Sequence, residues 1–282
     1  FIKEVIYSHS WEALRDVQIA AAETLFESEN NLLLTSSTAS GKTEAAFFPI
    51  LTELYENPPT SIGVLYIAPL KSLINDQFYR IEELLDETDI RVTHWHGDVA
   101  QSKKRKLLEN PSGILQITPE SLEAMLINRH NDIKRLFGDL RYVVLDEVHT
   151  LTGTDRGNQI LCQLSRIEQV IGRSPRRIGL SATVGDPETV ALWLSAGTKR
   201  LTDVPVFDNE KIRWRLGMEH FYIQNSSFSQ SPDVDEKKKA SKATLDAGYE
   251  YAYDCVTGQK SLVFSNSREE TEYVCATLRQ IA

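Results

Sequence analysis

Short apolar runs alternate with longer amphipathic stretches along most of the chain up to residue 197. Unbroken apolar runs are typical of strands buried on both faces, and apolar positions at helical spacing are typical of helices. The predicted strands lie at 31–35, 62–68, 90–95, 113–118, 141–145 and 177–181. The predicted helices lie at 10–27, from 44 onward, and at 70–85, 101–109, 119–126, 158–171 and 187–194. This alternation predicts an α/β fold with a mostly parallel sheet and helices on both faces.

The pattern changes after residue 197. Residues 198–242 are mixed and polar, with one strand expected at 219–223, and we predict a connecting segment that ends in a flexible linker. A helix at 243–255, a strand at 261–265 and a helix from 268 are then expected. The predicted domains are therefore 1–197, the connecting segment 198–242, and the start of a second α/β domain at 243–282.

Composition excludes few classes of protein. The 282 residues are 41% hydrophobic and 25% charged, which is ordinary for a globular chain, and the chain begins with Phe1, so we expect that its natural start has been trimmed. No stretch has the roughly 20 apolar residues that a membrane span needs. Three widely spaced cysteines indicate reduced thiols in a cytoplasmic protein. The net charge of −9 argues against a protein that simply coats nucleic acid, although a local basic groove stays possible.

A small-residue loop, Ser36–Thr43, connects the strand at 31–35 to the next helix. Backbone N–H groups of such a loop and of the helix start can surround a phosphate chain, with Lys42 on the β and γ phosphates and the Thr43 hydroxyl on Mg²⁺. The strict pattern has Gly where Ser36 stands, so a Ser/Thr-rich turn that caps a helix is the alternative. The predicted phosphate-binding residues are Thr38, Ala39, Ser40, Gly41, Lys42 and Thr43.

Two adjacent carboxylates, Asp146 and Glu147, follow the apolar strand at 141–145. A nucleotide hydrolase needs one acidic residue at such a strand end to hold Mg²⁺ and another to orient the attacking water. We predict that Asp146 has the first role and that Glu147, with Lys42, is catalytic. A strand-ending acidic turn is the structural alternative.

Several spaced motifs support a family resemblance. Asp146-Glu147-Val148-His149 and Ser181-Ala182-Thr183 resemble motifs II and III of superfamily 2 helicases. Longer runs resemble the large helicase-related (Lhr-like) branch of that superfamily, at 37–46, 68–77, 94–98, 117–122 and 178–187. The resemblance covers residues 11–195, and 261–281 more weakly. It implies a fragment with the first RecA-like domain of a P-loop NTPase and the start of the second.

The resemblance also implies roles for single residues. Arg15 and Gln18 match the segment that reads adenine, and His149, Ser181 and Thr183 match residues that link hydrolysis to the strand-binding side. Backbone N–H groups after Pro69 and Thr118 can receive phosphates without a large basic patch. The nucleic-acid-binding residues that the resemblance implies are Pro69, Lys71, Gly97, Thr118, Pro119, Glu120, Ser265 and Arg268.

The function implied is an ATP-dependent DNA helicase or translocase motor that uses ATP and Mg²⁺ and acts on single-stranded or partly duplex DNA. An RNA helicase of the Asp-Glu-x-His type and a nucleotide-switched binding module without turnover are the alternatives. The chain ends before motifs V and VI, whose arginines complete such ATP sites, so we expect weak hydrolysis and unwinding from it alone. Two features favour ordinary structure over function: the basic run Lys103–Lys106 as a solvated helix face, and Trp95, between His94 and His96, as packing.

Overall fold

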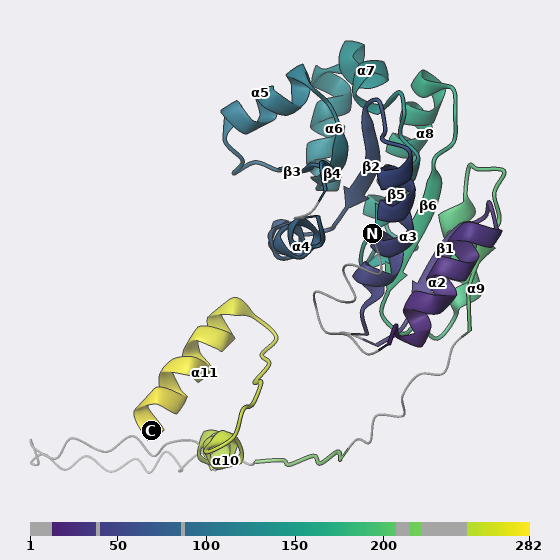
Figure 1. The fold of residues 1–282 in the computed structure, drawn as a ribbon. Helices are drawn as coiled ribbons and strands as arrows, with labels where there is room; N and C mark the ends of the chain where they lie inside the picture. The colour runs from purple at the N-terminus through teal and green to yellow at the C-terminus, as the bar shows by residue number, and fades with distance from the viewer. Residues whose placement is uncertain (1–12, 38–39, 86–87, 207–214, 222–246) are drawn as a thin grey trace, which may run out of the picture. The chain divides into compact units, whose positions relative to one another are not determined.

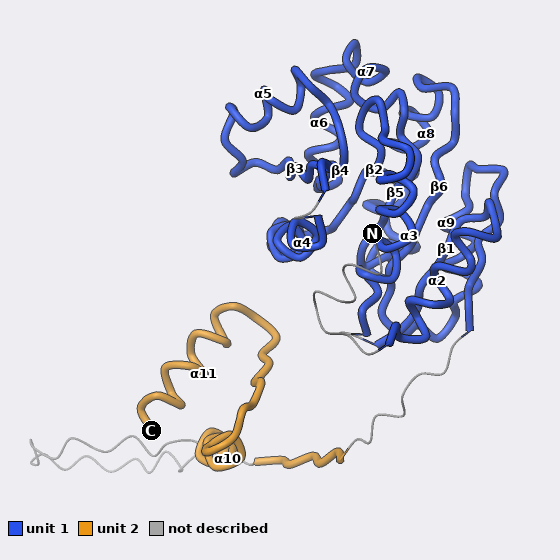
Figure 2. The backbone as a smooth tube through the Cα atoms, viewed as in Figure 1, with its two compact units in different colours: residues 1–210 blue, residues 211–282 orange. Residues whose placement is uncertain are grey.

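The computed structural model describes residues 13–37, 40–85, 88–206, 215–221 and 247–282. The chain divides into two compact units, residues 1–210 and 211–282, which are coloured separately in Figure 2. Each unit is described by itself.

The first unit contains a seven-stranded sheet in which every pair of neighbours is parallel. Its strand order is β3-β4-β2-β5-β6-β1-β7. The strands are β1 (Asn31–Thr35), β2 (Ile62–Ile67), β3 (Val92–Trp95), β4 (Gly113–Ile117), β5 (Tyr142–Leu145), β6 (Arg176–Ser181) and β7 (Thr202–Asp203). The predicted parallel α/β fold is confirmed, and β7 is an additional edge strand that pairs with β1.

The helices of this unit agree with the predicted ones to within three residues, except that the predicted helix at 10–27 begins only at Asp16, after the extended N-cap Arg15. They are α2 (Asp16–Glu27), α3 (Lys42–Glu56), α4 (Lys71–Leu84), α5 (Gln101–Glu109), α6 (Pro119–Asn128), α7 (Ile133–Phe137), α8 (Asp155–Ile171) and α9 (Pro187–Ser195). Two 3₁₀ turns, η1 (His130–Asp132) and η2 (Val148–Thr150), and the short α7 were not predicted, because each is too short to show a helical period.

Alternate residues of each strand face two separate cores. On β1, Leu32 and Leu34 belong to the core beneath α2, α3 and α4, whereas Leu33 belongs to the core beneath α6, α7, α8 and α9. Figure 1 shows the helices around this sheet. Because both faces are covered, the central strands carry apolar residues without alternation, which is the pattern that the sequence shows.

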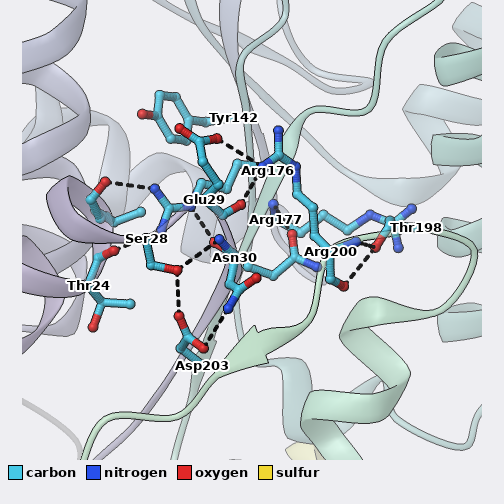
Figure 3. Close-up of polar contacts among 12 residues, drawn as sticks. Thr24, Ser28, Glu29, Asn30, Tyr142, Arg176, Arg177, Thr198, Arg200 and Asp203 are labelled. Carbon is cyan, nitrogen blue, oxygen red and sulfur yellow. Dashed lines mark hydrogen bonds and ion pairs between the residues drawn. The ribbon is translucent and has the colours of Figure 1, made fainter.

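Two arginines at the start of β6 hold helices against the amino edge of the sheet, as Figure 3 shows for the first. Arg176 donates to the carbonyl oxygens of Leu25 (2.7 Å) and Thr24 (3.0 Å), in the last turn of α2. Arg177 donates to the carbonyl oxygens of Leu194 and Ala196 at the end of α9. These bonds fix the C-terminal ends of α2 and α9. The N-terminal ends of both helices lie near the carboxyl edge of the sheet.

The second unit contains α10 (Ala247–Val256) and α11 (Arg268–Ile281). The predicted strand at 261–265 is wrong, since these residues pair with no strand and Leu262 and Phe264 are 85% and 87% exposed. The predicted strand at 219–223 is not formed over its described part, 219–221, and residues 222–223 and 243–246 lie outside the described residues. An apolar run becomes a strand only where a partner strand takes its backbone hydrogen bonds, and the described part of this unit offers none. Across the residues that the structure describes, none of the helices is both long enough and apolar enough to cross a membrane.

Candidate nucleotide and nucleic-acid sites

The loop after β1 is bonded to the end of the neighbouring strand β6. Ser36 is fully buried, and its N–H donates to the carbonyl oxygen of Ser181 at 3.3 Å. The hydroxyls of Ser36 and Ser40 lie 2.5 Å apart. The serine that replaces the usual glycine therefore makes hydrogen bonds inside the loop. The predicted residues Thr38 and Ala39 lie outside the described residues.

Gly41 connects this loop to α3 and requires the freedom of glycine. It has φ 87° and ψ 27°, in the left-handed region, and directly precedes the first helical residue. A Cβ on Gly41 would lie 3.0 Å from Nε2 of Gln18 and 3.7 Å from Arg15. Gln18 is buried and accepts a hydrogen bond from the N–H of Arg15 at 3.0 Å. The structure thus brings the two predicted adenine-reading residues against the end of the loop.

Lys42 turns its ammonium group into the loop, where Nζ donates to the carbonyl oxygens of Ser36 and Ser37, each at 2.8 Å. Burial lowers the pKa of Lys42, and the nearby charges of Glu147 and Asp146 oppose that shift. To bind a phosphate, Lys42 has to exchange carbonyl oxygens for phosphate oxygens. The next residue, Thr43, is buried in the first turn of α3.

Asp146 is a buried carboxylate held by two donors. The Tyr66 hydroxyl donates to Oδ2, and the N–H of Glu147 donates to Oδ1 at 2.9 Å. Burial raises the pKa of Asp146, while the hydrogen bond from Tyr66 and the charge of Lys42 act to lower it. Mg²⁺ in nucleotide sites takes one or two protein oxygens and completes its shell with water and phosphates. A buried carboxylate together with the Thr43 hydroxyl fits that requirement.

Glu147 has an unusual backbone, and its side chain contacts His149. Among the described residues it is the one non-glycine with positive φ (52°), a conformation that costs energy and is often found at functional sites. Its Oε2 lies 3.3 Å from Nε2 of His149. Nδ1 of His149 accepts the N–H of Ala182 at 3.3 Å and lies 3.4 Å from the Ser181 hydroxyl. This contact chain runs from the end of β5 to the end of β6, and Thr183 lies two residues further along.

The predicted nucleic-acid residues of the first unit lie at strand ends. Lys71 begins α4, and its Nζ donates to Oδ2 of Asp98 at 3.1 Å. A Cβ on Gly97 would be 3.4 Å from the same Nζ, so the loop that carries Gly97 lies against Lys71. The Thr118 side chain caps α6 by accepting the N–H of Ser121 at 3.3 Å. The segments before α4 and α6 follow β2 and β4, which are neighbours in the sheet.

Two side chains from α8 support these segments, and the sequence did not predict either of them. Arg156 donates to the carbonyl oxygen of Pro69 at 2.6 Å and pairs with Glu120. Gln163 is fully buried and donates to the carbonyl oxygen of Pro119 at 3.0 Å. Each contacts one glutamate of α6 and one backbone carbonyl, and a backbone carbonyl leaves no mark in a sequence.

Other candidate residues have ordinary surroundings. Trp95 packs against the core, as predicted, and Nζ of Lys104 lies 5.6 Å from its ring centre. The His94 ring stands edge-on to Phe78, with 4.5 Å between ring centres. In the second unit, Ser265 lies just before α11, and Arg268 pairs with Glu272 on the same helix at 3.4 Å.

The fold and this geometry define a class. A Gly-Lys-Thr loop follows β1 and an acidic pair follows β5, and both lie at the carboxyl edge of an all-parallel sheet covered on both faces. This arrangement is a RecA-like P-loop nucleotide-binding domain. The family model of the DEAD/DEAH box helicases matches residues 15–190, and the chain belongs to that family.

The chain is similar to proteins of the Lhr-like branch, as the motifs predicted. It is 30% identical over 273 residues to the ATP-dependent helicase Lhr-Core of Methanothermobacter thermautotrophicus, with 88% of this chain and 30% of that protein covered. It is 35% identical over 271 residues to the Lhr helicase/probable uracil glycosylase of Mycolicibacterium smegmatis, with coverage of 89% and 17%. The chain therefore spans less than a third of the length of these relatives.

Solved structures of two helicases are also similar to the chain. The structure of Mycobacterium smegmatis helicase Lhr bound to ssDNA and AMP-PNP matches with a TM-score of 0.74 and 28% identity, covering 98% of this chain and 35% of that one. The helicase MrfA bound to DNA matches with a TM-score of 0.63 and 27% identity, covering 72% and 28%.

Proposed function

We propose that this chain carries the ATP-binding and part of the DNA-binding machinery of an ATP-dependent DNA helicase or translocase. The observation that carries the proposal is the shared sheet edge: the loop with Lys42 follows β1, Asp146 and Glu147 follow β5, and both strands run parallel to β6 between them. The two carboxylates oppose the lowering of the Lys42 pKa by burial. A cation for phosphates, a carboxylate for Mg²⁺ and a second carboxylate for water are thereby gathered around one place.

Each side chain then has a distinct role. Lys42 neutralises the β and γ phosphates, and Arg15 with Gln18 contacts the base beside Gly41. Thr43 and Asp146 hold Mg²⁺, which when bound offsets negative charge on the phosphates. Glu147 accepts a proton from the attacking water, and its contact with His149 links this step to Ser181 and Thr183.

Single-stranded DNA binds at the starts of α4 and α6 in this proposal. The backbone N–H groups that follow Pro69 and Thr118 receive phosphates, with Lys71 and Gly97 at the side. The DNA-bound relatives, at 28% and 27% identity, support DNA as the substrate. We also propose the domain limits 1–197, 198–242 and 243–282. Ser265 and Arg268 are proposed as nucleic-acid contacts of the second domain. The proposed location is the cytoplasm.

The test is ATP turnover by the longest natural chain that contains these residues, with no nucleic acid, with single-stranded DNA, or with single-stranded RNA of the same sequence. Strong stimulation by DNA is expected. Stimulation by RNA alone would indicate an RNA-dependent motor and contradict the assignment of DNA as the substrate.

Glu147→Gln tests the hydrolytic role. We expect turnover to fall by roughly 10²–10⁴ while a fluorescent ATP analogue still binds, because the amide cannot accept the proton from water. Glu188→Gln is the control, since Glu188 is an exposed carboxylate in the first turn of α9 and should leave turnover unchanged. Wild-type turnover in Glu147→Gln would refute the catalytic role of Glu147, whereas nucleotide binding without turnover in the wild-type chain would favour a binding module that uses no hydrolysis.

A further inference from the structure

One guanidinium from α8 joins two other elements. Nη2 of Arg156 lies 2.6 Å from the carbonyl oxygen of Pro69, directly after β2, and 2.7 Å from Oε1 of Glu120, in the first turn of α6. The Arg156 side chain is 35% exposed, and its Nε is buried with no hydrogen-bond partner among the described residues. In Figure 1, α8, α6 and β2 can be located in the first unit.

The backbone that carries Arg156 is fixed to the acidic turn after β5. Thr154 caps α8 by accepting the N–H of Gly157 at 3.1 Å. A Cβ on Gly157 would lie 2.0 Å from the carbonyl oxygen of Leu151, so only glycine allows α8 to begin this close to the turn. Leu151 in turn donates its N–H to the carbonyl oxygen of Val148, within η2. Arg156 and Glu147 therefore belong to the same compact segment, which runs from the end of β5 to the first turn of α8.

We propose that Arg156 is a positioning residue for the DNA-binding edge: it fixes the starts of α4 and α6 relative to each other and ties both to the segment that carries Glu147. The proposal rests on the function proposed above. Successive phosphates of one strand have a limited range of spacings, so two helix starts that receive them need a defined separation.

Arg156 also has an electrostatic effect at this edge. Glu120 is 61% exposed in the first turn of α6, where its negative charge suits the helix dipole but repels an approaching phosphate. Pairing with Arg156 offsets that repulsion. Removing the guanidinium therefore both loosens the edge and leaves an uncompensated carboxylate beside the phosphate path.

The same two helices supply a matched control. Arg166, ten residues further along α8, pairs with Glu123 of α6 at 2.7 Å, and these side chains are 44% and 26% exposed. Arg166→Ala removes an ion pair between the same helices but no bond to Pro69. Both variants are compared with wild type by fluorescence anisotropy on a labelled single-stranded oligonucleotide, over a series of salt concentrations.

We expect Arg156→Ala to weaken binding of single-stranded DNA about tenfold, equivalent to about 1.4 kcal/mol, and Arg166→Ala to stay within about twofold of wild type. Arg156→Lys should recover part of the loss. A lysine ammonium can bond to the Pro69 carbonyl or to Glu120, but it lacks the planar guanidinium that holds both in a fixed geometry. Arg156→Ala combined with Glu120→Gln should lose less affinity than Arg156→Ala alone, because the second change removes the uncompensated carboxylate.

Besides an Arg156→Ala variant that binds like wild type, three results would overturn the proposal. The first is equal losses in Arg156→Ala and Arg166→Ala. The second is a loss of ATP-analogue binding as large as the loss of DNA binding, which would indicate general damage to the fold. The third is a fall of about one in the slope of log affinity against log salt, which would make Arg156 a direct phosphate ligand. Wild-type protein that fails to bind single-stranded DNA would refute the proposed DNA-binding function itself, whereas a wild-type-like Arg156→Ala refutes only the role of Arg156.

Discussion

The buried Arg176 offers the sharpest test of how the adenine-reading helix is held. Its guanidinium makes three hydrogen bonds to backbone carbonyls, at Thr24 and Leu25 in the last turn of α2 and at Asn30 before β1 (Figure 3). The last carbonyls of any helix lack partners within the helix. Arg176→Met fills a similar volume but takes the guanidinium donor from all three carbonyls, of which that of Thr24 keeps the N–H of Ser28 at 3.1 Å.

The expected cost follows from the bonds lost and the burial recovered. A hydrogen bond from a charged donor contributes about 1.5–3 kcal/mol, so three independent bonds would set an upper limit near 9 kcal/mol. They share one guanidinium, and burial lowers the pKa of Arg176, which shows that placing its charge there opposes folding. We therefore expect a loss of about 3 kcal/mol in the free energy of unfolding. In a domain of this size that corresponds to a fall in Tm of about 6–12 °C.

Arg200 provides the control within the same cluster. It pairs with Glu29 at 3.0 Å, but these side chains are 29% and 90% exposed. Arg200 also donates to the carbonyl oxygen of Glu29, so Arg200→Met removes one such bond where Arg176→Met removes three. It should cost clearly less than Arg176→Met, because the ion pair itself is exposed and contributes little. Tm is measured by circular dichroism, and binding of an ATP analogue is measured well below the lower Tm. Equal Tm values for the two variants would refute the reasoning, and so would unchanged ATP affinity in Arg176→Met, since α2 carries Gln18 at its other end.

Two further variants test the nucleotide site itself. Gly41→Ala places a methyl group 3.0 Å from Gln18 on a backbone with φ 87°, so we expect a loss of about 1–2 kcal/mol in stability and at least a tenfold loss of ATP-analogue affinity by calorimetry; wild-type affinity would show that the loop tolerates the strain. Tyr66→Phe removes a hydrogen bond that favours the ionised form of Asp146, so the pKa of Asp146 should rise further above its ordinary value. Because Mg²⁺ needs the carboxylate, which exists above that pKa and is lost as pH falls through it, Mg²⁺-dependent binding should fail at a higher pH in Tyr66→Phe than in wild type. A binding curve that overlays that of wild type across the acid range would contradict this assignment.

The sequence predicted the elements whose signal is local. β1, β2, β4 and β5 are short, mainly apolar runs, and every one is buried on both faces, so the run itself carries the information. The run at 261–265 has the same composition but forms no strand in the structure. A strand is completed by hydrogen bonds to a neighbour, and β7, only two residues long, exists because β1 offers its edge. Partner availability is a property of the fold, which a local pattern does not contain.

The candidate site also contains residues that the sequence predicted and features that it did not. Side chains expected to touch ligand follow strand ends, and parallel strands bring those ends to one edge, so Lys42, Asp146 and Glu147 could be grouped before their positions were known. The left-handed backbone of Glu147 could not be predicted, because glutamate rarely adopts this conformation and nothing in the sequence indicates it.

The supporting residues could not be predicted either, for a reason that concerns their partners. Arg156, Gln163 and Arg176 each donate to a backbone carbonyl, and each bond joins segments at least 40 residues apart in the chain. Every residue has a carbonyl, so neither spacing nor residue type marks the acceptor. A guanidinium can hold several carbonyls at once, which makes arginine effective in this role and difficult to distinguish from a surface cation in a sequence. Changes at such positions should alter how the binding segments are held while the motif residues themselves stay intact, and for that reason Arg156 and Arg176 are the informative positions to mutate.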